Sequence, residues 1–424
     1  MTTASRAPRA FITGIGVLTA IGTGLPAFRN GLRANRSPVV RINRFDPSAF
    51  RSQVAAQIDD FEPLDHMDPK AARALDRFSQ FGLVTGRMAM ADAGLVPGAP
   101  GSPARDRVGI FLGSALGGIA FAEAQHEQYL ARGLRGVSPT LALAVFGGAA
   151  PANLGIALDV RGPILSTANS CASGAVAIGE ALGAIRSGEV DAAVAGGVEC
   201  PLSPLAFGAF DLIRALSHGR NADPGQAARP MDADRDGFVM GEGATLLVIE
   251  SEASVRARGV TPYAELLGYA ATSDAHHMVQ PRPDGSEAGR AASLALADAR
   301  VAPAEVDWVS AHASSTPIGD IAEARALAMA LGDRAGSVPV SATKAMTGHP
   351  LGATGAIEAA MAALAIRDGW VPGSCNLVGP EPELTALLPN VLPVGRDARV
   401  ERVLSTSFGF GGLNAALVLG APPA

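Results

Sequence analysis

Lysine is nearly absent from this sequence: only Lys70 and Lys344 occur among its 34 basic residues, so the other positive charges are arginines. Charged residues make up 17% of the 424-residue chain, and the formal net charge is −6. This balance argues against binding to a nucleic-acid phosphate backbone as the main function. The two lysines kept in so arginine-rich a composition are candidates for specific roles.

Cysteine is also scarce, and uninterrupted apolar runs are lacking. Three cysteines in a chain of this length provide no disulfide framework, which favours a reducing compartment and a cytoplasmic location. The apolar run near the start is broken by Gly14 and Gly16, unlike a signal peptide. Residues 136–158 carry no charge, but Pro139 and Pro151 make them a poor membrane helix. We expect this segment to form buried core or a subunit interface.

A hydrophobic content of 48% supports a large core and excludes a disordered chain. Short β-rich runs alternate with alanine-rich helical runs, which predicts an α/β layered fold. The polar stretch 256–261 is the most plausible boundary between two halves, residues 1–257 and 258–424, although no sequence repeat is evident. The expected strands are 10–13, 108–112, 192–195, 245–249, 306–310, 338–342 and 402–407. The expected helices are 69–93, 172–187, 286–299, 320–331 and 355–367.

Cys171 is the strongest catalytic candidate. It begins a glycine- and alanine-rich helix that has no charge before Glu180. The positive end of a helix dipole favours thiolate over thiol, and small neighbours permit the tight strand-to-helix turn that nucleophiles occupy. The alternative is an inert buried thiol, which is the expectation for Cys200 and Cys375.

Two histidines follow expected strands in turns rich in small residues. His312 comes directly after the strand expected at 306–310, and His349 follows the strand expected at 338–342. Ligands bind at the carboxyl ends of strands in open α/β sheets, so both histidines are candidates for the same site. Lys344 and Glu358 lie in apolar surroundings, and we expect them to pair and brace the loop of His349.

Other segments have less specific interpretations. The spacing of Asp320 and Glu323 is typical of a helix start with a capping-box pattern. The glycine-rich residues 408–412 follow a strand and allow close backbone approach and a backbone N–H donor. Phosphate binding is the competing interpretation of that turn, but no Lys-Ser/Thr pair follows it.

Three motif matches fail. The glycine pair near the start lacks the third glycine of a dinucleotide fingerprint, because Thr19 stands there. Residues 232–237 imitate a calcium loop, but Gly243 occupies the position of the bidentate acid. The pair His276-His277 lacks further ligands at zinc spacing. No metal site is expected.

Taken together, the motifs resemble the β-ketoacyl-acyl-carrier-protein synthases, the condensing enzymes of the thiolase superfamily. The resemblance spans residues 13–414 and is strongest to the elongating, KAS II-like branch. The presence of two histidines separates this branch from the initiating synthases, which look like Cys-His-Asn, and from thiolases. The matching motifs are Cys-Ala-Ser-Gly at 171–174, Arg-Asp-Gly-Phe-Val at 235–239, the run from His312 to Pro317, Lys-Ala-Met-Thr-Gly-His at 344–349, and Phe-Gly-Phe-Gly-Gly at 408–412.

The resemblance implies a thiolase fold, a duplicated five-layer αβαβα sandwich, and a decarboxylative Claisen condensation in fatty-acid elongation. Cys171 would hold the acyl chain, while His312 and His349 hydrogen-bond the thioester oxygen of the malonyl unit. The backbone N–H groups of Cys171 and Phe410 would form the oxyanion hole. No cofactor of the protein's own is expected, because phosphopantetheine arrives on the acyl carrier protein. The family partner is that carrier protein, with no nucleic acid or membrane.

The resemblance also assigns supporting roles. Lys344 and Glu358 would support the histidines, and Ser314 and Thr316 would contact the phosphopantetheine arm. At the acyl pocket, Phe410 with Phe408 would act as the gate, and Leu116 and Leu141 would line the wall. The residues expected to dock the carrier protein are Lys70, Arg73, Arg77 and Arg214. Lys70, Arg73 and Arg77 are spaced to share one helical face. Three positions carry residues other than those common in housekeeping relatives: Thr140, Leu141 and Leu413. These differences leave the accepted acyl chain length open.

Three alternatives follow from the same residues. The chain could be the catalytic ketosynthase subunit of a type II polyketide system, acting as a heterodimer with a chain-length-factor subunit rather than as a homodimer. It could be that non-catalytic partner, although such subunits typically lack the nucleophile that Cys171 provides here. A hydrolase would need a Ser/His/acid set that the sequence does not offer.

Overall fold

The computed structural model describes residues 8–423, and its core is two five-stranded sheets joined in one hydrogen-bonded path. The N-terminal sheet has the order β6-β5-β7-β8-β1, and the C-terminal sheet has the order β11-β10-β14-β15-β9. The sheets meet where β1 pairs with β9 at residues 10–12. The strands are β1 Ala10–Thr19, β5 Val108–Gly113, β6 Ile164–Thr167, β7 Ala192–Glu199, β8 Gly243–Ser251, β9 Ala264–Ser273, β10 Trp308–Ser310, β11 Val340–Ser341, β14 Arg402–Gly409 and β15 Leu413–Gly420.

The two sheets have the same topology. When strands are numbered within each half, both follow the order 3-2-4-5-1. In both, strands 3, 2 and 4 are parallel, whereas strand 5 is antiparallel to strands 4 and 1. The sequence carries no visible repeat, so the duplication is evident only in this strand order. The halves divide between β8 and β9.

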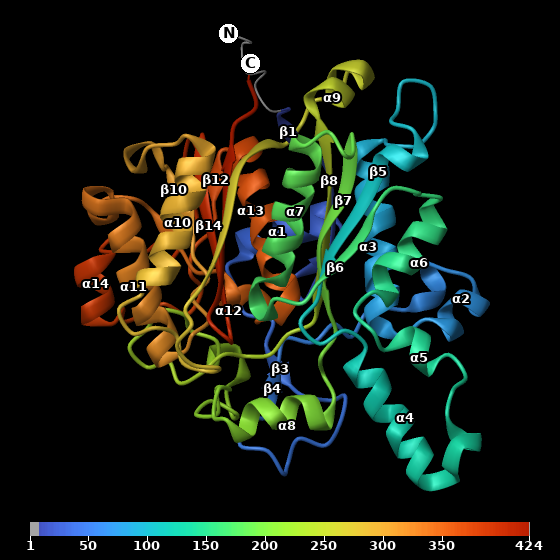
Figure 1. Ribbon diagram of the computed structural model, residues 1–424. Coiled ribbons are helices and arrows are strands. Elements are labelled where there is room, and N and C mark those ends of the chain that lie inside the picture. The colour runs from blue at the N-terminus through green and yellow to red at the C-terminus, as the bar shows by residue number, and fades with distance from the viewer. Residues whose placement is uncertain (1–7, 424) are drawn as a thin grey trace.

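Helices cover both outer faces and fill the space between the sheets (Figure 1). Helices α7 (Ser173–Arg186) and α13 (Thr354–Asp368) lie between the sheets, where α13 contacts α7, β8 and β14. Helices α3 (Arg77–Ala93) and α6 (Ala149–Leu158) cover the N-terminal sheet, while α10 (Ser286–Ala299) and α11 (Pro317–Leu331) cover the C-terminal sheet. The predicted five-layer αβαβα fold is confirmed. Enclosure explains why α7 and α13 are apolar around almost their whole circumference.

The helix predicted over residues 69–93 is wrong as a single element. Helix α2 (Pro69–Ala74) ends at Leu75, whose φ of −96° and ψ of 139° are extended. A new helix then starts because the Asp76 side chain accepts a hydrogen bond from the Ser79 N–H. The sheet strands β6, β9 and β15 were not predicted, and the seven expected strands are present with different ends.

Smaller elements frame the site and the surface. They are α1 Leu25–Ala34, β2 Gly22–Thr23, β3 Val40–Arg41, β4 Val54–Ala55, α4 Ile119–Arg132, α5 Leu141–Ala144, α8 Pro204–Leu212, α9 Glu252–Arg258, α12 Lys344–Thr347, β12 Trp370–Val371, α14 Pro382–Leu387 and β13 Arg396–Asp397. Within residues 8–423, no helix has the length and apolar character needed to cross a membrane.

Candidate active site

Cys171, His312 and His349 converge at one cavity. The His349 Nε2 atom lies 3.1 Å from Cys171 Sγ, and the two imidazole rings have centroids 5.3 Å apart. Cys171 stands in a short 3-10 turn ahead of α7, His312 follows β10, and His349 follows α12. All three are buried, and all three line a cavity of about 360 Å³. The site therefore combines groups from both halves of the duplicated fold.

The turn that carries Cys171 is held by the serine of the Cys-Ala-Ser-Gly motif. Ser170 has a φ of 52°, in the left-handed region that non-glycine residues seldom adopt. The Ser173 hydroxyl donates to the Ser170 carbonyl at 2.6 Å and accepts from the Asn169 N–H at 2.8 Å. These bonds stabilise a backbone conformation that costs about 1 kcal/mol or more and fix the direction of the thiol.

Burial favours the uncharged forms of the thiol and of both imidazoles. It raises the pKa of Cys171 to about 11, against smaller lowering effects from the Ser170 hydroxyl and the Lys344 charge. Burial also lowers the pKa of His349 and His312 well below its usual value, and the Lys344 charge adds to this. Burial therefore works against the thiolate that the helix end is expected to favour. In the close contact, burial favours the neutral thiol of Cys171 and the neutral imidazole of His349.

Lys344 is the buried cation of the site. Its ammonium group lies 2.6 Å from Glu358 Oε1 and also donates to the His312 backbone carbonyl. The expected pairing of Lys344 with Glu358 is thus present, and Lys344 also contacts the loop of the other histidine. Burial raises the pKa of Glu358 to about 8, although the adjacent lysine opposes the rise.

The glycine-rich turn closes over the thiol. Phe408 is the residue before the last of β14, with its ring 6.1 Å from that of His312. The Phe410 ring stacks on Phe210 of α8 at 6.1 Å between centroids. The Phe410 backbone N–H is directed at Cys171 Sγ. A Cβ at Gly409 would lie 3.0 Å from the Cys171 backbone nitrogen, so the two backbone segments are in direct contact. This places two backbone N–H groups beside the nucleophile candidate.

The cavity mouth holds the predicted hydroxyl pair. Ser314 and Thr316 line the cavity with their hydroxyl oxygens 3.1 Å apart, and exposed Arg214 lines its edge. Leu116 and Leu141 are placed differently. Leu116 packs beside the apolar cluster that contains Cys171, and Leu141 begins α5. Neither leucine lines this cavity, so their assignment to an acyl pocket stays a prediction.

The expected docking face is divided. Lys70 and Arg73 are exposed on α2, whereas Arg77 begins α3 and is half-buried. The Arg77 guanidinium lies 3.0 Å from Glu242 and stacks 4.6 Å above the Phe81 ring. The prediction that Lys70, Arg73 and Arg77 share one helical face is wrong, because the Asp76 cap separates the two helices. Arg77 is occupied by contacts within the fold.

Two buried acids at the site were not identified as site residues from the sequence. Glu323, assigned only to a helix start, accepts from the His312 N–H at 2.8 Å and from the Thr406 hydroxyl at 2.7 Å. Glu199 accepts from the N–H groups of Leu116 and Gly352, both at 3.0 Å, and burial raises its pKa to about 7. Both acids hold loops that carry site residues. A lone acid among apolar residues, the signal used for Glu358, could have indicated Glu199.

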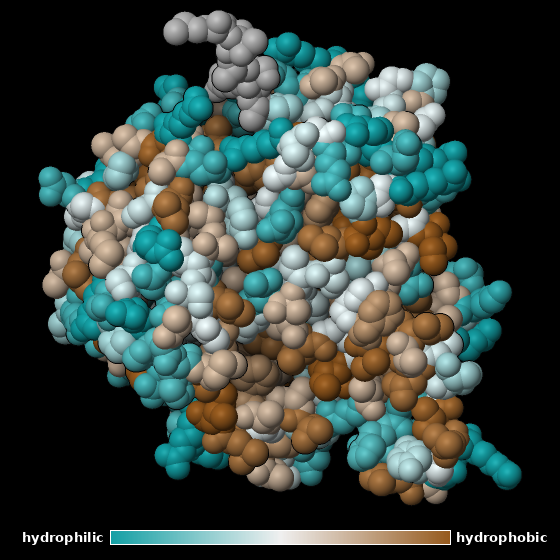
Figure 2. Space-filling view, in the orientation of Figure 1, coloured by the Kyte–Doolittle hydropathy of each residue, from teal (hydrophilic) through white to brown (hydrophobic). Residues whose placement is uncertain are grey.

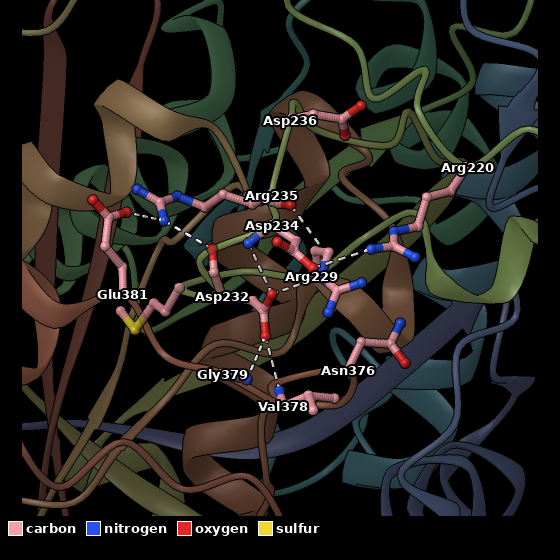
Figure 3. Close-up of polar contacts among 12 residues, drawn as sticks. Arg220, Arg229, Asp232, Asp234, Arg235, Asp236, Asn376, Val378, Gly379 and Glu381 are labelled. Atoms are coloured by element: carbon pink, nitrogen blue, oxygen red, sulfur yellow. Dashed lines mark hydrogen bonds and ion pairs between the residues drawn. The ribbon is translucent and has the colours of Figure 1, made fainter.

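The calcium-like segment is part of the fold's polar scaffold (Figure 3). Asp232 accepts from Arg229 at 2.8 Å and from the N–H groups of Val378 and Gly379, both at 2.9 Å. Arg235 reaches Glu381, as the dashed lines in Figure 3 mark. The network anchors the segment that brings Phe238 to 5.2 Å from the His349 ring. Across residues 8–423, no group of three or more His, Cys, Asp or Glu side chains is arranged to hold a metal ion.

Comparison with known proteins follows the same division of the chain. Residues 8–254 match the family model for the N-terminal domain of β-ketoacyl synthases, and residues 263–378 match the model for their C-terminal domain. The chain belongs to the β-ketoacyl synthase family. It is a condensing enzyme, an acyltransferase by class.

Other family members resemble the chain over nearly its whole length. The 3-oxoacyl-[acyl-carrier-protein] synthase 2 of Coxiella burnetii is 40% identical over 412 residues, covering 97% of this chain and 98% of the relative. A β-ketoacyl synthase structure from Burkholderia phymatum is 32% identical with a TM-score of 0.89, covering 98% of this chain and 100% of that one.

A polyketide ketosynthase is also similar. In the structure described as AntDE:AntF, a type II polyketide synthase acyl-carrier protein is in complex with its ketosynthase bound to the hexaketide. Its matching chain is 30% identical with a TM-score of 0.88, covering 99% of this β-ketoacyl synthase and 100% of that chain.

Proposed function

We propose that the protein is an elongating β-ketoacyl-acyl-carrier-protein synthase, which joins an acyl chain to a malonyl unit with loss of CO₂. The observation that carries this proposal is the 3.1 Å contact between Cys171 Sγ and His349 Nε2, with His312 in the same cavity. A thiol, two neutral imidazoles and adjacent backbone N–H groups are the set that acyl transfer followed by carbanion formation requires.

Acyl transfer comes first. The Cys171 thiol gives its proton to His349 as the sulfur attacks the thioester of the acyl carrier protein. The backbone N–H groups of Cys171 and Phe410 stabilise the negative oxygen of the tetrahedral intermediate. The bond to the pantetheine sulfur then breaks, and that sulfur leaves with the proton from His349.

Condensation follows when malonyl-acyl-carrier protein replaces the first carrier. Neutral N–H donors on His312 and His349 stabilise the enolate oxygen as the carboxylate leaves as CO₂. The enolate carbon attacks the acyl carbonyl on Cys171, and the Cys171 sulfur leaves and takes up a proton from solvent. The product is a 3-oxoacyl group on the carrier. In this proposal, Ser314 and Thr316, which line the cavity, hydrogen-bond the pantetheine amides of the incoming arm.

The partners in this proposal are the acyl carrier protein and a second copy of the chain. Apolar side chains lie exposed along the edge strand β6 and over α5 and α6, where Figure 2 shows brown surface. They are Leu143, Phe146, Ile156, Ile164 and Leu165. An apolar area beside an unpaired strand edge favours a subunit interface. A reducing, cytoplasmic location fits three unpaired cysteines, and no nucleic acid or membrane is part of the proposal.

The runner-up is a ketosynthase subunit of a type II polyketide system that pairs with a chain-length-factor subunit. The structural likeness to AntDE:AntF supports it. Sequence identity favours fatty-acid elongation, because it is 40% to a 3-oxoacyl-acyl-carrier-protein synthase and 30% to that polyketide ketosynthase.

The test uses the purified protein with saturated medium- and long-chain acyl-carrier proteins. Intact-mass spectrometry should show one acyl adduct per chain, and malonyl-acyl-carrier protein should then release a 3-oxoacyl product. The Cys171→Ala variant should form no adduct while retaining malonyl decarboxylation. Light scattering should report a self-dimer. Acylation only by oxo or unsaturated chains, or only with a second subunit present, would move the protein to the polyketide function.

A further inference from the structure

The two active-site histidines differ in the hydrogen bonding of their Nδ1 ring nitrogen. His349 Nδ1 lies 2.9 Å from the Thr354 hydroxyl oxygen. His312 Nδ1 is buried with no hydrogen-bond partner among residues 8–423. Thr354 is the first residue of α13 and is only 2% exposed. Its hydroxyl makes no other side-chain hydrogen bond within the described part of the chain, so His349 is its one partner there.

A hydroxyl can serve a neutral imidazole in both of its tautomers. When Thr354 donates to Nδ1, the ring proton sits on Nε2, and Nε2 acts as a donor. When Nδ1 carries the proton and donates to Thr354, Nε2 presents a lone pair to the Cys171 thiol. A backbone N–H at the same place could only donate and would fix the first tautomer.

We propose that Thr354 is a positioning residue whose hydroxyl lets His349 alternate between proton acceptor and proton donor during one catalytic cycle. This inference rests on the proposed function, because only the two half-reactions together need both tautomers. It concerns a residue that does not touch the substrate and acts through His349.

In acyl transfer, His349 Nε2 takes the proton from Cys171 Sγ while Nδ1–H donates to Thr354. The new C–S bond forms at Cys171, the old one breaks at the pantetheine sulfur, and the Nε2 proton passes to that sulfur. In condensation, Nε2 must carry a proton to donate to the enolate oxygen, and Thr354 then donates to Nδ1. In the change of tautomer, Nε2 takes up one proton from water in the cavity, while Nδ1 gives its proton to the Thr354 hydroxyl, which passes its own proton on to solvent. The protons balance and no other reagent is needed.

Among residues 8–423, His349 Nδ1 has no hydrogen-bond partner other than Thr354. The charge that acts on His349 is the Lys344 ammonium, which can only donate, and its partner Glu358 is occupied by that lysine at 2.6 Å. The burial that lowers the pKa of His349 keeps the ring neutral between steps, which is the state in which a tautomer choice exists.

The test compares Thr354→Val, which keeps the shape and removes the hydroxyl, with Thr354→Ser, which keeps the hydroxyl. Thr343→Val is the matched control, because Thr343 is equally buried in the same region and its hydroxyl has no hydrogen-bond partner in the described structure. We expect Thr354→Val to lower kcat for acylation and for condensation by about tenfold or more, with KM for the carrier substrates within about twofold. Thr354→Ser should stay within about threefold of the wild type, and Thr343→Val should match it.

If Thr354→Val does not fold, the Ser and Ala variants carry the test, because both lose the methyl group and differ only by the hydroxyl. Equal rates for Thr354→Val and Thr343→Val, or for Thr354→Ser and Thr354→Ala, would overturn the proposal. A wild-type protein that forms no acyl adduct and no 3-oxoacyl product would instead refute the proposed function, so the two failures are distinguishable.

Discussion

Lys344 is one of two lysines in the chain, and it connects the two histidine loops through charge and hydrogen bonding. Its ammonium group is buried against Glu358 and the His312 carbonyl. A buried charge without its partner is costly, because little solvent is available to stabilise it. Lys344 therefore has two expected effects: it stabilises the fold by pairing with Glu358, and it supports activity through the histidine loops.

Removing the Lys344 charge should separate the effect on stability from the effect on activity. We expect Lys344→Met to lower the free energy of unfolding by about 3 kcal/mol, because Glu358 is left buried and unpaired. The double variant Lys344→Met/Glu358→Gln should recover most of that loss but not condensation activity, since the His312 carbonyl still lacks its donor. Urea denaturation and product assays measure the two effects. Lys70→Met, a change at the exposed second lysine, is the stability control and should shift unfolding by less than about 0.5 kcal/mol.

Equal stability of the Lys344 single and double variants would contradict the buried-charge argument. Recovery of full activity in the double variant would instead show that Lys344 acts only through Glu358 and not through the loop of His312.

At single residues, motif position was easier to predict than electrostatic state. The sequence places Cys171 at a helix start and both histidines after strands, and these residues do meet. It could not reveal the burial that raises the pKa of Cys171 to about 11. Nor could it reveal that Glu323 bonds the His312 loop, because that contact depends on how β14 and α11 pack.

Among the elements, the start of α7 and the turn after His349 approach each other closely at the site. A Cβ on Gly174 would lie 2.8 Å from the Gly352 carbonyl oxygen and 3.2 Å from Ala356 Cβ. Real Cβ atoms essentially never come closer than 3.0 Å to another heavy atom, so one segment would have to shift. The shift would separate Cys171 from His349, because the two residues stand at the ends of these segments.

Gly174→Ala should therefore cost about 1–3 kcal/mol in unfolding free energy and slow acylation of Cys171 by about tenfold or more. Gly183→Ala is the matched control on the same helix, where a Cβ meets nothing within 4 Å. That control should keep full activity and gain up to about 1 kcal/mol, because alanine favours a helix over glycine. Thermal unfolding and intact-mass kinetics compare the two. A Gly174→Ala variant that acylates as fast as Gly183→Ala would show that the helix contact does not set the thiol position.

Helices and strands were predicted correctly where burial is uniform along the element. They were missed where a helix cap or strand pairing defines the element. The helix 286–299 was predicted with its observed ends, and the apolar helices α7 and α13 were predicted within a few residues. The break at Leu75 was missed because a run of good helix formers hid the Asp76 cap. Strands β9 and β15 were missed because glycine, alanine and a few polar residues interrupt their apolar pattern, and their pairing with each other defines them. Strand β6 was missed because it is only 4 residues long.

At the scale of the whole molecule, the local distribution of charged side chains matters more for docking than the net charge. The chain carries a net charge of −6 and is proposed to bind an acidic carrier protein, so docking needs a local basic area. Arg214 lines the cavity edge, and Arg73 is exposed on α2. Arg77 is the weakest of the four docking candidates, because its guanidinium is paired with Glu242.

Charge reversal at Arg73 and Arg214 should weaken binding of acyl-carrier protein by about tenfold at low salt, with a smaller effect at high salt because ions screen exposed charges. The matched control is the double variant Arg256→Glu/Arg399→Glu, which changes the net charge equally at two exposed arginines. Arg256 lies on α9, at the opposite end of the molecule from α8 and the segment that carries Arg214 (Figure 1). Titration calorimetry at two salt concentrations measures both. Equal weakening by the two double variants would mean that only the overall charge matters, and unchanged affinity in both would remove these arginines from the docking surface.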